Sequence, residues 1–176
     1  MGFSGDRNTL TKHASLSRRA RAALCAALLL AGCRAGIQSQ PPAPRATAAT
    51  DLAAAERLGG HTMARHVGLT DEDLRERLRR EPNIAAASTY PDRQTAERVI
   101  DATLRRFDRR IEAWSARTGT RPNLALDYRG QTGEIVGRSL RRGDARVRTC
   151  ADAVVVLRWH PSGIRYVLTS YPECRP

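Results

Sequence analysis

The longest amphipathic pattern in the chain lies between residues 90 and 119, where apolar side chains recur at spacings of three and four. This spacing places them on one stripe of a helix, and it predicts that the stripe faces a core. Asp92 is the expected N-cap, and Gly119 is expected to end the helix. The apolar positions are Ala96, Val99, Ile100, Leu104, Phe107, Ile111 and Trp114.

Two shorter helices are predicted ahead of this one. Asp51 can cap a helix over residues 52–58. Thr70 can cap a second helix, with Asp73 three residues later as a variant of the capping box, and Pro82 ends it. The first half of the folded part is therefore expected to be helical.

Beyond residue 123 the period of the apolar positions changes to two, which indicates strands. The segment His-Pro-Ser-Gly at 160–163 predicts a tight hairpin between the last two strands. Helices followed by antiparallel strands predict an α+β domain. The four expected strands cover residues 124–128, 134–140, 153–159 and 164–171.

The last predicted strand has an unusual number of hydroxyl groups. Thr169 and Tyr171 are two residues apart and should share one face, with Tyr166, Leu168 and Ser170 on the other. Hydroxyls aligned beside an arginine-rich helical layer suit the binding of a phosphate. The alternative is that Thr and Tyr stand there as ordinary strand-forming residues.

The N-terminus predicts export. Three arginines between positions 18 and 21 precede an apolar stretch at 22–31, which is far shorter than the ~20 residues of a membrane-spanning helix. The following Leu-Ala-Gly-Cys resembles the bacterial lipobox, so residues 1–32 are expected to be a lipoprotein signal peptide and Cys33 the lipidated residue. The domain would then lie outside the cytoplasm, anchored to the cell membrane or the outer membrane. The alternative is ordinary signal cleavage that leaves Cys33 as a free thiol.

Residues 33–50 are rich in Ala, Pro, Gln and Thr and show no apolar period. This composition predicts a disordered tether. Residues 51–176 then remain for one small domain with one core.

Two cysteines remain once Cys25 is removed with the signal peptide and Cys33 carries lipid. A hairpin turn at 160–163 pairs residues whose numbers sum to about 323 or 324, and Cys150 and Cys174 sum to 324. They should therefore lie opposite each other at the open end of the hairpin and form a disulfide in an oxidising compartment. Two free thiols are the alternative.

The chain is strongly basic, with 30 Lys and Arg against 18 Asp and Glu and a net charge of +12. Such an excess favours a polyanionic partner, either nucleic acid or an anionic membrane surface. A GC-rich coding bias toward arginine is the compositional alternative, since Lys12 is the single lysine. Any group of the folded domain that binds phosphate through a full positive charge must therefore be an arginine.

His61 and His66 stand five residues apart, just ahead of the basic helix predicted from Thr70. The helical zinc motif needs two histidines four apart with a glutamate after the first, and neither condition is met. Elsewhere no Asp, Glu, His or Cys side chains are grouped at metal-ligand spacing, so the sequence implies no metal or cofactor. The plain alternative is two partly exposed histidines near a helix end.

Four motifs in register give the chain a family resemblance that spans residues 58–173. Together they resemble the bacterial RNase A-like toxin domain found at the C-terminus of contact-dependent growth inhibition proteins and other polymorphic toxins. The resemblance implies a kidney-shaped α+β ribonuclease with helices ahead of a curved antiparallel sheet, RNase A-like. The motifs are GGHTMARHVGLTDEDLRERL, ASTYPDRQTAERVI, LDYRGQTGEIVGR and VVVLRWHPSGIRYVLTSYPE.

The resemblance also implies an active site of a histidine, an arginine, a threonine and a tyrosine. These fall on His66, Arg77, Thr169 and Tyr171, with His61 kept as a second acid–base group. Because the arginine motif is short, its neighbours Arg75 and Arg79 are alternatives to Arg77.

These residue types suit metal-free RNA cleavage, in which the ribose 2′-OH attacks the phosphorus and a 2′,3′-cyclic phosphate forms. A neutral imidazole with a pKa near ~6.5 can take the 2′-OH proton. A planar arginine can bind the non-bridging oxygens in bidentate fashion, and the threonine hydroxyl can add a donor. Either Tyr171 or His61 could protonate the leaving 5′-oxygen.

The expected function is thus an endoribonuclease, a toxin or effector acting on RNA, with tRNA as one candidate substrate. A cognate immunity protein is a candidate partner, the membrane is contacted through the lipid anchor alone, and a monomer is expected. A lipidated signal directly before such a domain differs from the usual toxin arrangement, where a large delivery protein precedes it. The competing interpretations are a non-catalytic surface lipoprotein that binds polyanions and an envelope structural protein.

Overall fold

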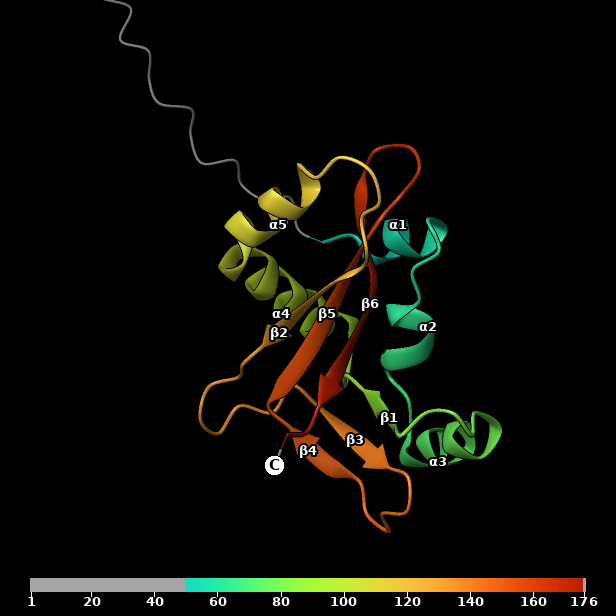
Figure 1. The fold of residues 1–176 in the computed structure, drawn as a ribbon. Helices are drawn as coiled ribbons and strands as arrows, with labels where there is room; N and C mark the ends of the chain where they lie inside the picture. The colour runs from blue at the N-terminus through green and yellow to red at the C-terminus, as the bar shows by residue number, and fades with distance from the viewer. Residues whose placement is uncertain (1–49, 176) are drawn as a thin grey trace, which may run out of the picture. The chain divides into compact units, whose positions relative to one another are not determined.

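The computed structural model describes residues 50–175 and shows five helices and six strands in this part of the chain (Figure 1). The predicted signal peptide, the lipidated Cys33 and nearly all of the predicted tether lie outside the described residues. Within residues 50–175, no helix has the length and apolar character needed to cross a bilayer.

Local capping chemistry sets the starts of α1, α3 and α4. Asp51 accepts a hydrogen bond from the Ala54 amide at the start of α1 (Leu52–Arg57), and Asp92 does the same for Thr95 at α4 (Arg93–Arg106). Thr70 and Asp73 form the reciprocal capping box of α3 (Asp71–Arg80). These three helix starts are as predicted, whereas the short α2 (Thr62–His66) was not foreseen.

The long helix expected up to Gly119 is in fact two helices. Phe107 leaves the helical region at φ −105° and ψ 19°, and α5 (Asp108–Ser115) begins after it in a different direction (Figure 1). After the break, Trp114 packs edge-on against Trp159 and donates a hydrogen bond to the Pro122 carbonyl. No glycine or proline marks this position, so the break follows from tertiary packing and not from a local signal.

The strands form two antiparallel three-stranded sheets. The first has the order β1-β3-β4 and the second β2-β5-β6, as seen in Figure 1. The α+β class is confirmed, but β1 and β4 were not predicted, and β1 stands between helices α3 and α4. The strand bounds are β1 Ala86–Thr89, β2 Leu124–Tyr128, β3 Gly137–Arg141, β4 Arg148–Cys150, β5 Asp152–Trp159 and β6 Arg165–Glu173.

The main core lies between α4 and the β2-β5-β6 sheet. The predicted stripe supplies it with Ala96, Val99 and Ile100 from α4, and Ile111 and Trp114 from α5. A second, smaller cluster joins α3 to the other sheet through Leu74, Leu78, Ala87 and Leu140. Burial of these apolar faces fixes α3 and α4 on their sheets.

A β-bulge in the last hairpin corrects the predicted register. Near the turn, Trp159 pairs with Arg165, but beyond Val156 one extra residue, Leu168, shifts the pairing by one. Val167 and Ser170 therefore share the core face, opposite Leu157 and Val155.

The predicted assignment of the β6 side chains to the two faces of the strand is consequently right for one pair of residues and wrong for another. Thr169 and Tyr171 do share a face, because they pair with Val156 and Val154, which are two residues apart. Tyr166 and Ser170, expected together, point to opposite faces, since the bulge between them inverts the alternation.

Cys150 and Cys174 are joined by a disulfide with their Cα atoms 4.5 Å apart. They are not partners within one hairpin as expected, because Cys150 ends β4 and pairs with Gly137, while Cys174 follows the end of β6. The bridge therefore links the two sheets at the C-terminal end of β6.

Candidate active site

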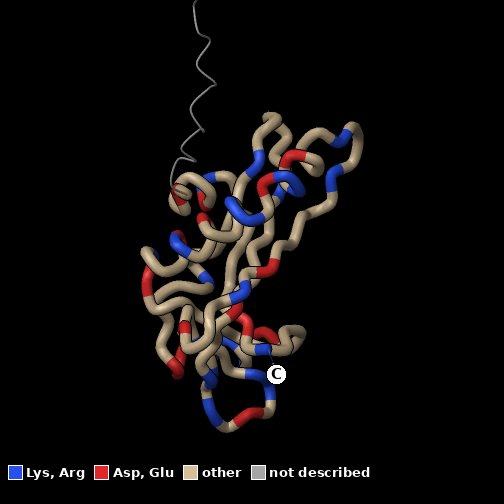
Figure 2. The backbone as a smooth tube through the Cα atoms, turned by 90° about the vertical axis from the view of Figure 1, so that its left-hand side faces the viewer, with Lys and Arg blue, Asp and Glu red and all other residues tan. Residues whose placement is uncertain are grey.

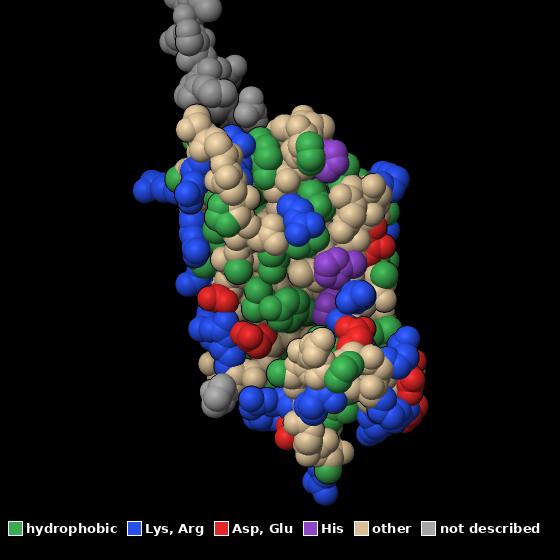
Figure 3. Space-filling model, turned by 45° about the vertical axis from the view of Figure 1, so that its right-hand side comes forward, with side chains coloured by type: hydrophobic (Ala, Val, Ile, Leu, Met, Phe, Trp, Pro, Cys, Tyr) green, Lys and Arg blue, Asp and Glu red, His purple; other side chains and the backbone are tan. Residues whose placement is uncertain are grey.

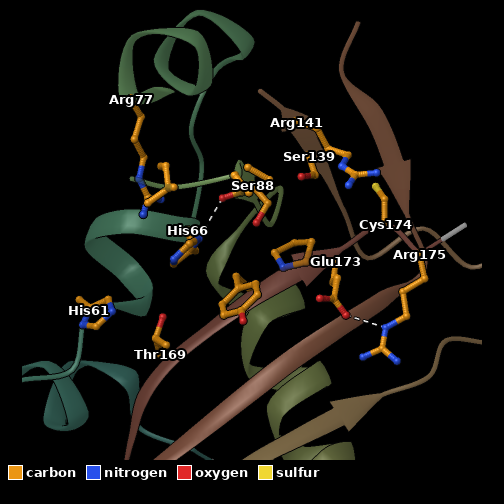
Figure 4. Close-up of a pocket in the computed structure, with 15 residues that line it drawn as sticks. His61, His66, Arg77, Ser88, Ser139, Arg141, Thr169, Glu173, Cys174 and Arg175 are labelled. Atoms are coloured by element: carbon orange, nitrogen blue, oxygen red, sulfur yellow. Dashed lines mark hydrogen bonds and ion pairs between the residues drawn. The ribbon is translucent and has the colours of Figure 1, made fainter. Parts of the chain in front are cut away.

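One pocket of about 740 Å³ opens between α2, α3, β1, β3 and the end of β6. All five residues singled out from the sequence line it: His61, His66, Arg77, Thr169 and Tyr171 (Figure 4). Figure 3 shows histidine side chains at the surface of this face, with an arginine beside them. Residues more than a hundred positions apart in the chain thus meet at one site.

The bulge in β6 and the turn before α2 fit together and set the site's geometry. The His61 amide donates to the Leu168 carbonyl at 2.9 Å, and the Ser170 amide donates to the Thr62 hydroxyl at 2.9 Å. A Cβ at Gly60 would lie 2.7 Å from the Val167 carbonyl oxygen, so only glycine allows this approach. The start of α2 is thereby locked against the strand segment that contains Thr169.

His66 is 7% exposed at the end of α2, and its Nδ1 lies 3.0 Å from the Ser88 carbonyl oxygen. A carbonyl can only accept, so Nδ1 carries the proton and Nε2 keeps its lone pair. Burial lowers the pKa of His66 to about 3, and the positive charge of Arg77 adds to this, while the Ser88 hydrogen bond acts in the opposite direction. The imidazole is therefore neutral at neutral pH, with one nitrogen able to accept a proton.

Arg77 reaches from α3 toward the last turn of α2 (Figure 4). Its Nη1 donates to the Arg65 carbonyl at 2.8 Å and its Nε to Glu81 Oε1 at 3.3 Å, and its side chain is 11% exposed. Arg75 and Arg79 do not line the pocket; both form ion pairs with Glu72. Of the three arginines considered from the sequence, Arg77 is thus the one at the site.

Thr169 presents a hydroxyl that has no partner within the described residues. The side-chain Oγ1 is buried and makes no hydrogen bond, and Figure 4 shows it pointing into the space between His61 and His66. A buried hydroxyl without a partner costs free energy, so such groups are uncommon in folded proteins. The wall of the pocket therefore holds a hydroxyl whose hydrogen-bonding capacity is unused within the described residues.

The Tyr171 ring lies against the imidazole of His66, with 5.4 Å between ring centroids. Burial raises the pKa of its phenol, and the nearby carboxylates of Glu173 and Asp127 raise it further. The phenol consequently holds its proton at neutral pH. It can donate that proton or a hydrogen bond.

His61 is the N-cap residue of α2 but makes no capping hydrogen bond with its side chain. Burial lowers its pKa, as do the charges of Arg65 and Arg77. Its imidazole faces the pocket from the side opposite Ser88 (Figure 4). A neutral His61 is a weaker proton donor than an ordinary surface histidine.

The remaining residues that line the pocket were not predicted from the sequence. They include Ser88 on β1, Ser139 and Arg141 on β3, and Glu173 and Arg175 at the end of β6. The position of β1 decides which of these side chains face inward, and no period-two pattern marked this four-residue strand. Among residues 50–175, no three His, Cys, Asp or Glu side chains are grouped closely enough to hold a metal ion.

Comparisons with known proteins indicate the family to which the chain is similar. Residues 60–172 match the family model of the bacterial CdiA-CT RNAse A domain. A chain in the crystal structure of the CdiA-CT/CdiI complex from Y. kristensenii is 28% identical to this one, with a TM-score of 0.57. The match covers 65% of this chain and 99% of that chain. A comparison with curated proteins gave no match.

Proposed function

The chain belongs to the bacterial CdiA-CT RNase A family of ribonuclease toxin domains, and we propose that it cleaves RNA without a metal ion by attack of the ribose 2′-OH. The observation that carries this proposal is the neutral, buried His66, whose free Nε2 shares a pocket with the Arg77 guanidinium and the partnerless Thr169 hydroxyl. A base, a cation and a neutral hydrogen-bond donor are the groups that this reaction requires.

His66 is the general base of the proposed reaction. Its Nε2 removes the 2′-OH proton as the 2′-oxygen forms a bond to phosphorus, and the resulting imidazolium is oriented by the Nδ1–H bond to Ser88. A pKa of about 3 makes the imidazole of the free protein a weak base. A bound phosphate would offset the charge of Arg77, and it would therefore raise the pKa of His66 when substrate is present.

Arg77 and Thr169 stabilise the charge that builds on the non-bridging oxygens. Arg77 uses Nη1 and Nε to hold the protein, which leaves Nη2 and the second hydrogen of Nη1 for the phosphate. Thr169 contributes its hydroxyl, which gains in the complex the hydrogen bond that it lacks without a ligand. Arg77 is held in place by these two hydrogen bonds before substrate binds, so little reorganisation of its guanidinium is needed.

Tyr171 is the better of the two candidates for the general acid. As the bond between phosphorus and the 5′-oxygen breaks, that oxygen takes a proton, and the products are a 2′,3′-cyclic phosphate and a 5′-OH. The raised pKa of Tyr171 keeps its proton in place, while the lowered pKa of His61 leaves that side chain mainly neutral. We assign His61 to binding the substrate at the same phosphate.

We base the proposed biological setting on the family and on the N-terminal sequence. We propose RNA, with tRNA among the candidates, as the substrate of a monomeric toxin, and a cognate immunity protein as its partner by analogy with CdiI in the solved complex. Export with a lipid anchor at Cys33 also remains our proposal. The disulfide between Cys150 and Cys174 supports export alone, since such bonds persist in oxidising compartments, and the lipid anchor rests on the Leu-Ala-Gly-Cys sequence.

Incubation of the purified chain lacking residues 1–33 with total tRNA in the presence of EDTA tests the proposed function. We expect fragments that end in 2′,3′-cyclic phosphate, and no cleavage of DNA, which lacks the 2′-OH. RNA that stays intact but binds with an affinity that falls with salt would support instead the non-catalytic, polyanion-binding lipoprotein.

A further inference from the structure

The pocket extends well beyond the phosphate site formed by His66, Arg77 and Thr169. Its volume of about 740 Å³ lies in the upper part of the ~300–1,000 Å³ range of ligand sites. Figure 4 shows Arg77 at one side of the pocket and Arg141, Cys174 and Arg175 at the other. A single phosphodiester would leave the second side empty.

Strands β1 and β3 form a polar floor that connects the two sides. Ser88 pairs with Ser139, and two residues along the strands Ala86 pairs with Arg141, so all four side chains share the pocket face. Two residues of a strand span about 7 Å. The floor thus runs from Ser88, whose carbonyl holds His66, to Arg141, and the small Ala86 leaves room beside the guanidinium.

Arg141 differs from the other arginines of the pocket in having no partner. Arg77 is held by the Arg65 carbonyl and Glu81, and Arg175 forms 2.6 Å ion pairs with Glu173 and Asp127. The guanidinium of Arg141 makes no hydrogen bond or ion pair with any residue between 50 and 175. Because arginine keeps its charge at all relevant pH values, this end of the pocket holds an uncompensated cation.

We propose that Arg141 binds a second phosphate of the RNA, one that neighbours the cleaved phosphodiester. The guanidinium presents two parallel N–H groups, which match the two non-bridging oxygens of a phosphate. Ser88 offers its hydroxyl to the nucleotide that lies between the two phosphates, whereas the Ser139 hydroxyl already donates to the Ala87 carbonyl and can only accept. This subsite rests on the proposed function, and it makes the site one for RNA chains and not for isolated nucleotides.

The matched control is Arg146, in the loop between β3 and β4 (the basic loop at the lower end of Figure 2). Arg146 is exposed and does not line the pocket, so Arg146→Gln removes the same charge from the same hairpin. Arg141 is also exposed, and Arg141→Gln should therefore fold normally, which a thermal unfolding curve checks directly.

The test uses a DNA oligonucleotide with one ribonucleotide, so that cleavage occurs at one known phosphate. Two further substrates each carry one neutral methylphosphonate linkage. In the first substrate it is the linkage on the 5′ side of the cleaved phosphate, and in the second it is the linkage on the 3′ side. With all phosphates charged, Arg141→Gln should lower kcat/KM about 10- to 100-fold, as expected for one lost charge-assisted hydrogen bond, and Arg146→Gln should not. One of the two neutral linkages replaces the phosphate that Arg141 contacts. On that substrate the Arg141→Gln variant and the unmutated protein should have equal kcat/KM. An equal loss on all three substrates, or no loss on any, overturns the proposal.

A binding experiment separates this subsite from the proposed function. An RNA oligonucleotide with methylated 2′-oxygens cannot be cleaved, and its Kd is measured by fluorescence anisotropy over a range of salt concentrations. Arg141→Gln should reduce the slope of log Kd against log salt by about 0.7, the value for one phosphate contact on a single strand. An unchanged slope overturns the subsite. If the unmutated protein leaves the cleavable substrate whole, the proposed catalysis fails, and the salt slope still decides on the subsite.

Discussion

The Nδ1 atom of His66 lies 3.0 Å from the carbonyl oxygen of Ser88, a residue on the strand β1. The same stretch of chain is held by two backbone bonds to Tyr90, from the Tyr90 amide to the His66 carbonyl and from the Gly68 amide to the Tyr90 carbonyl. The imidazole is consequently fixed in both orientation and tautomer. This preorganisation is what a general base needs before substrate arrives.

Replacing His66 with alanine should lower the rate of RNA cleavage by about 10²- to 10⁴-fold, because that is the usual contribution of a general base. The measurement is kcat/KM on a defined RNA. His160→Ala is the control: His160 sits at the hairpin turn, bonded to Ser162 and outside the pocket, and its loss should leave activity near the original level. A His66→Ala protein that is as active as the unmutated one would remove His66 from the mechanism.

On the acid side of the pH profile, kcat/KM should begin to fall only at an unusually low pH. Since the pKa of His66 is lowered to about 3 in the free protein, its base form persists at pH 5, where a typical histidine is mostly protonated. We therefore expect kcat/KM to fall little between pH 7 and pH 5. A half-maximal point near pH 6.5 would show that the imidazole is not shielded from solvent as the structure indicates.

The same burial makes stability depend on pH. Unfolded His66 has a pKa of about 6.5, well above its folded value, so below pH 6.5 the unfolded state binds the extra proton. Neutral His66 therefore makes its full contribution to the free energy of unfolding above pH 6.5. This contribution is lost progressively toward pH 3, at up to about 1.4 kcal/mol per pH unit. Urea unfolding should give a smaller free energy of unfolding at pH 5 than at pH 7. The His66→Gln substitution should make this difference smaller.

Most helix starts of this domain were predictable from the sequence because they depend on neighbouring residues. Asp51, Thr70 and Asp92 each bond an amide three residues ahead. The break at Phe107 and the bulge at Leu168 depend on distant partners and had no such signal. The site shows the same division, since motifs located the residues around His66, whereas Arg141 became part of the pocket only through its pairing with the unpredicted strand β1.

The disulfide between Cys150 and Cys174 should contribute about 3 to 4 kcal/mol to the free energy of unfolding, the chain-entropy value for a loop of this size. Changing both cysteines to alanine should lower the unfolding midpoint by the corresponding amount. A titration of thiols in the oxidised, denatured domain without residues 1–33 should find none. Two reactive thiols per chain would mean that the bond does not form.

Thr169→Val distinguishes a catalytic hydroxyl from a structural one. The substitution keeps the shape of the side chain and removes a buried oxygen that has no hydrogen-bond partner within residues 50–175. Removing an unsatisfied buried polar group is neutral or stabilising, so the midpoint of unfolding should stay the same or rise. RNA cleavage should nevertheless fall about 10-fold or more, because the phosphate loses one donor. Thr169→Ser, which keeps the hydroxyl, should retain more activity than Thr169→Val while being less stable, since it loses a buried methyl group. If the valine variant is destabilised and fully active, the hydroxyl serves the fold and takes no part in the reaction.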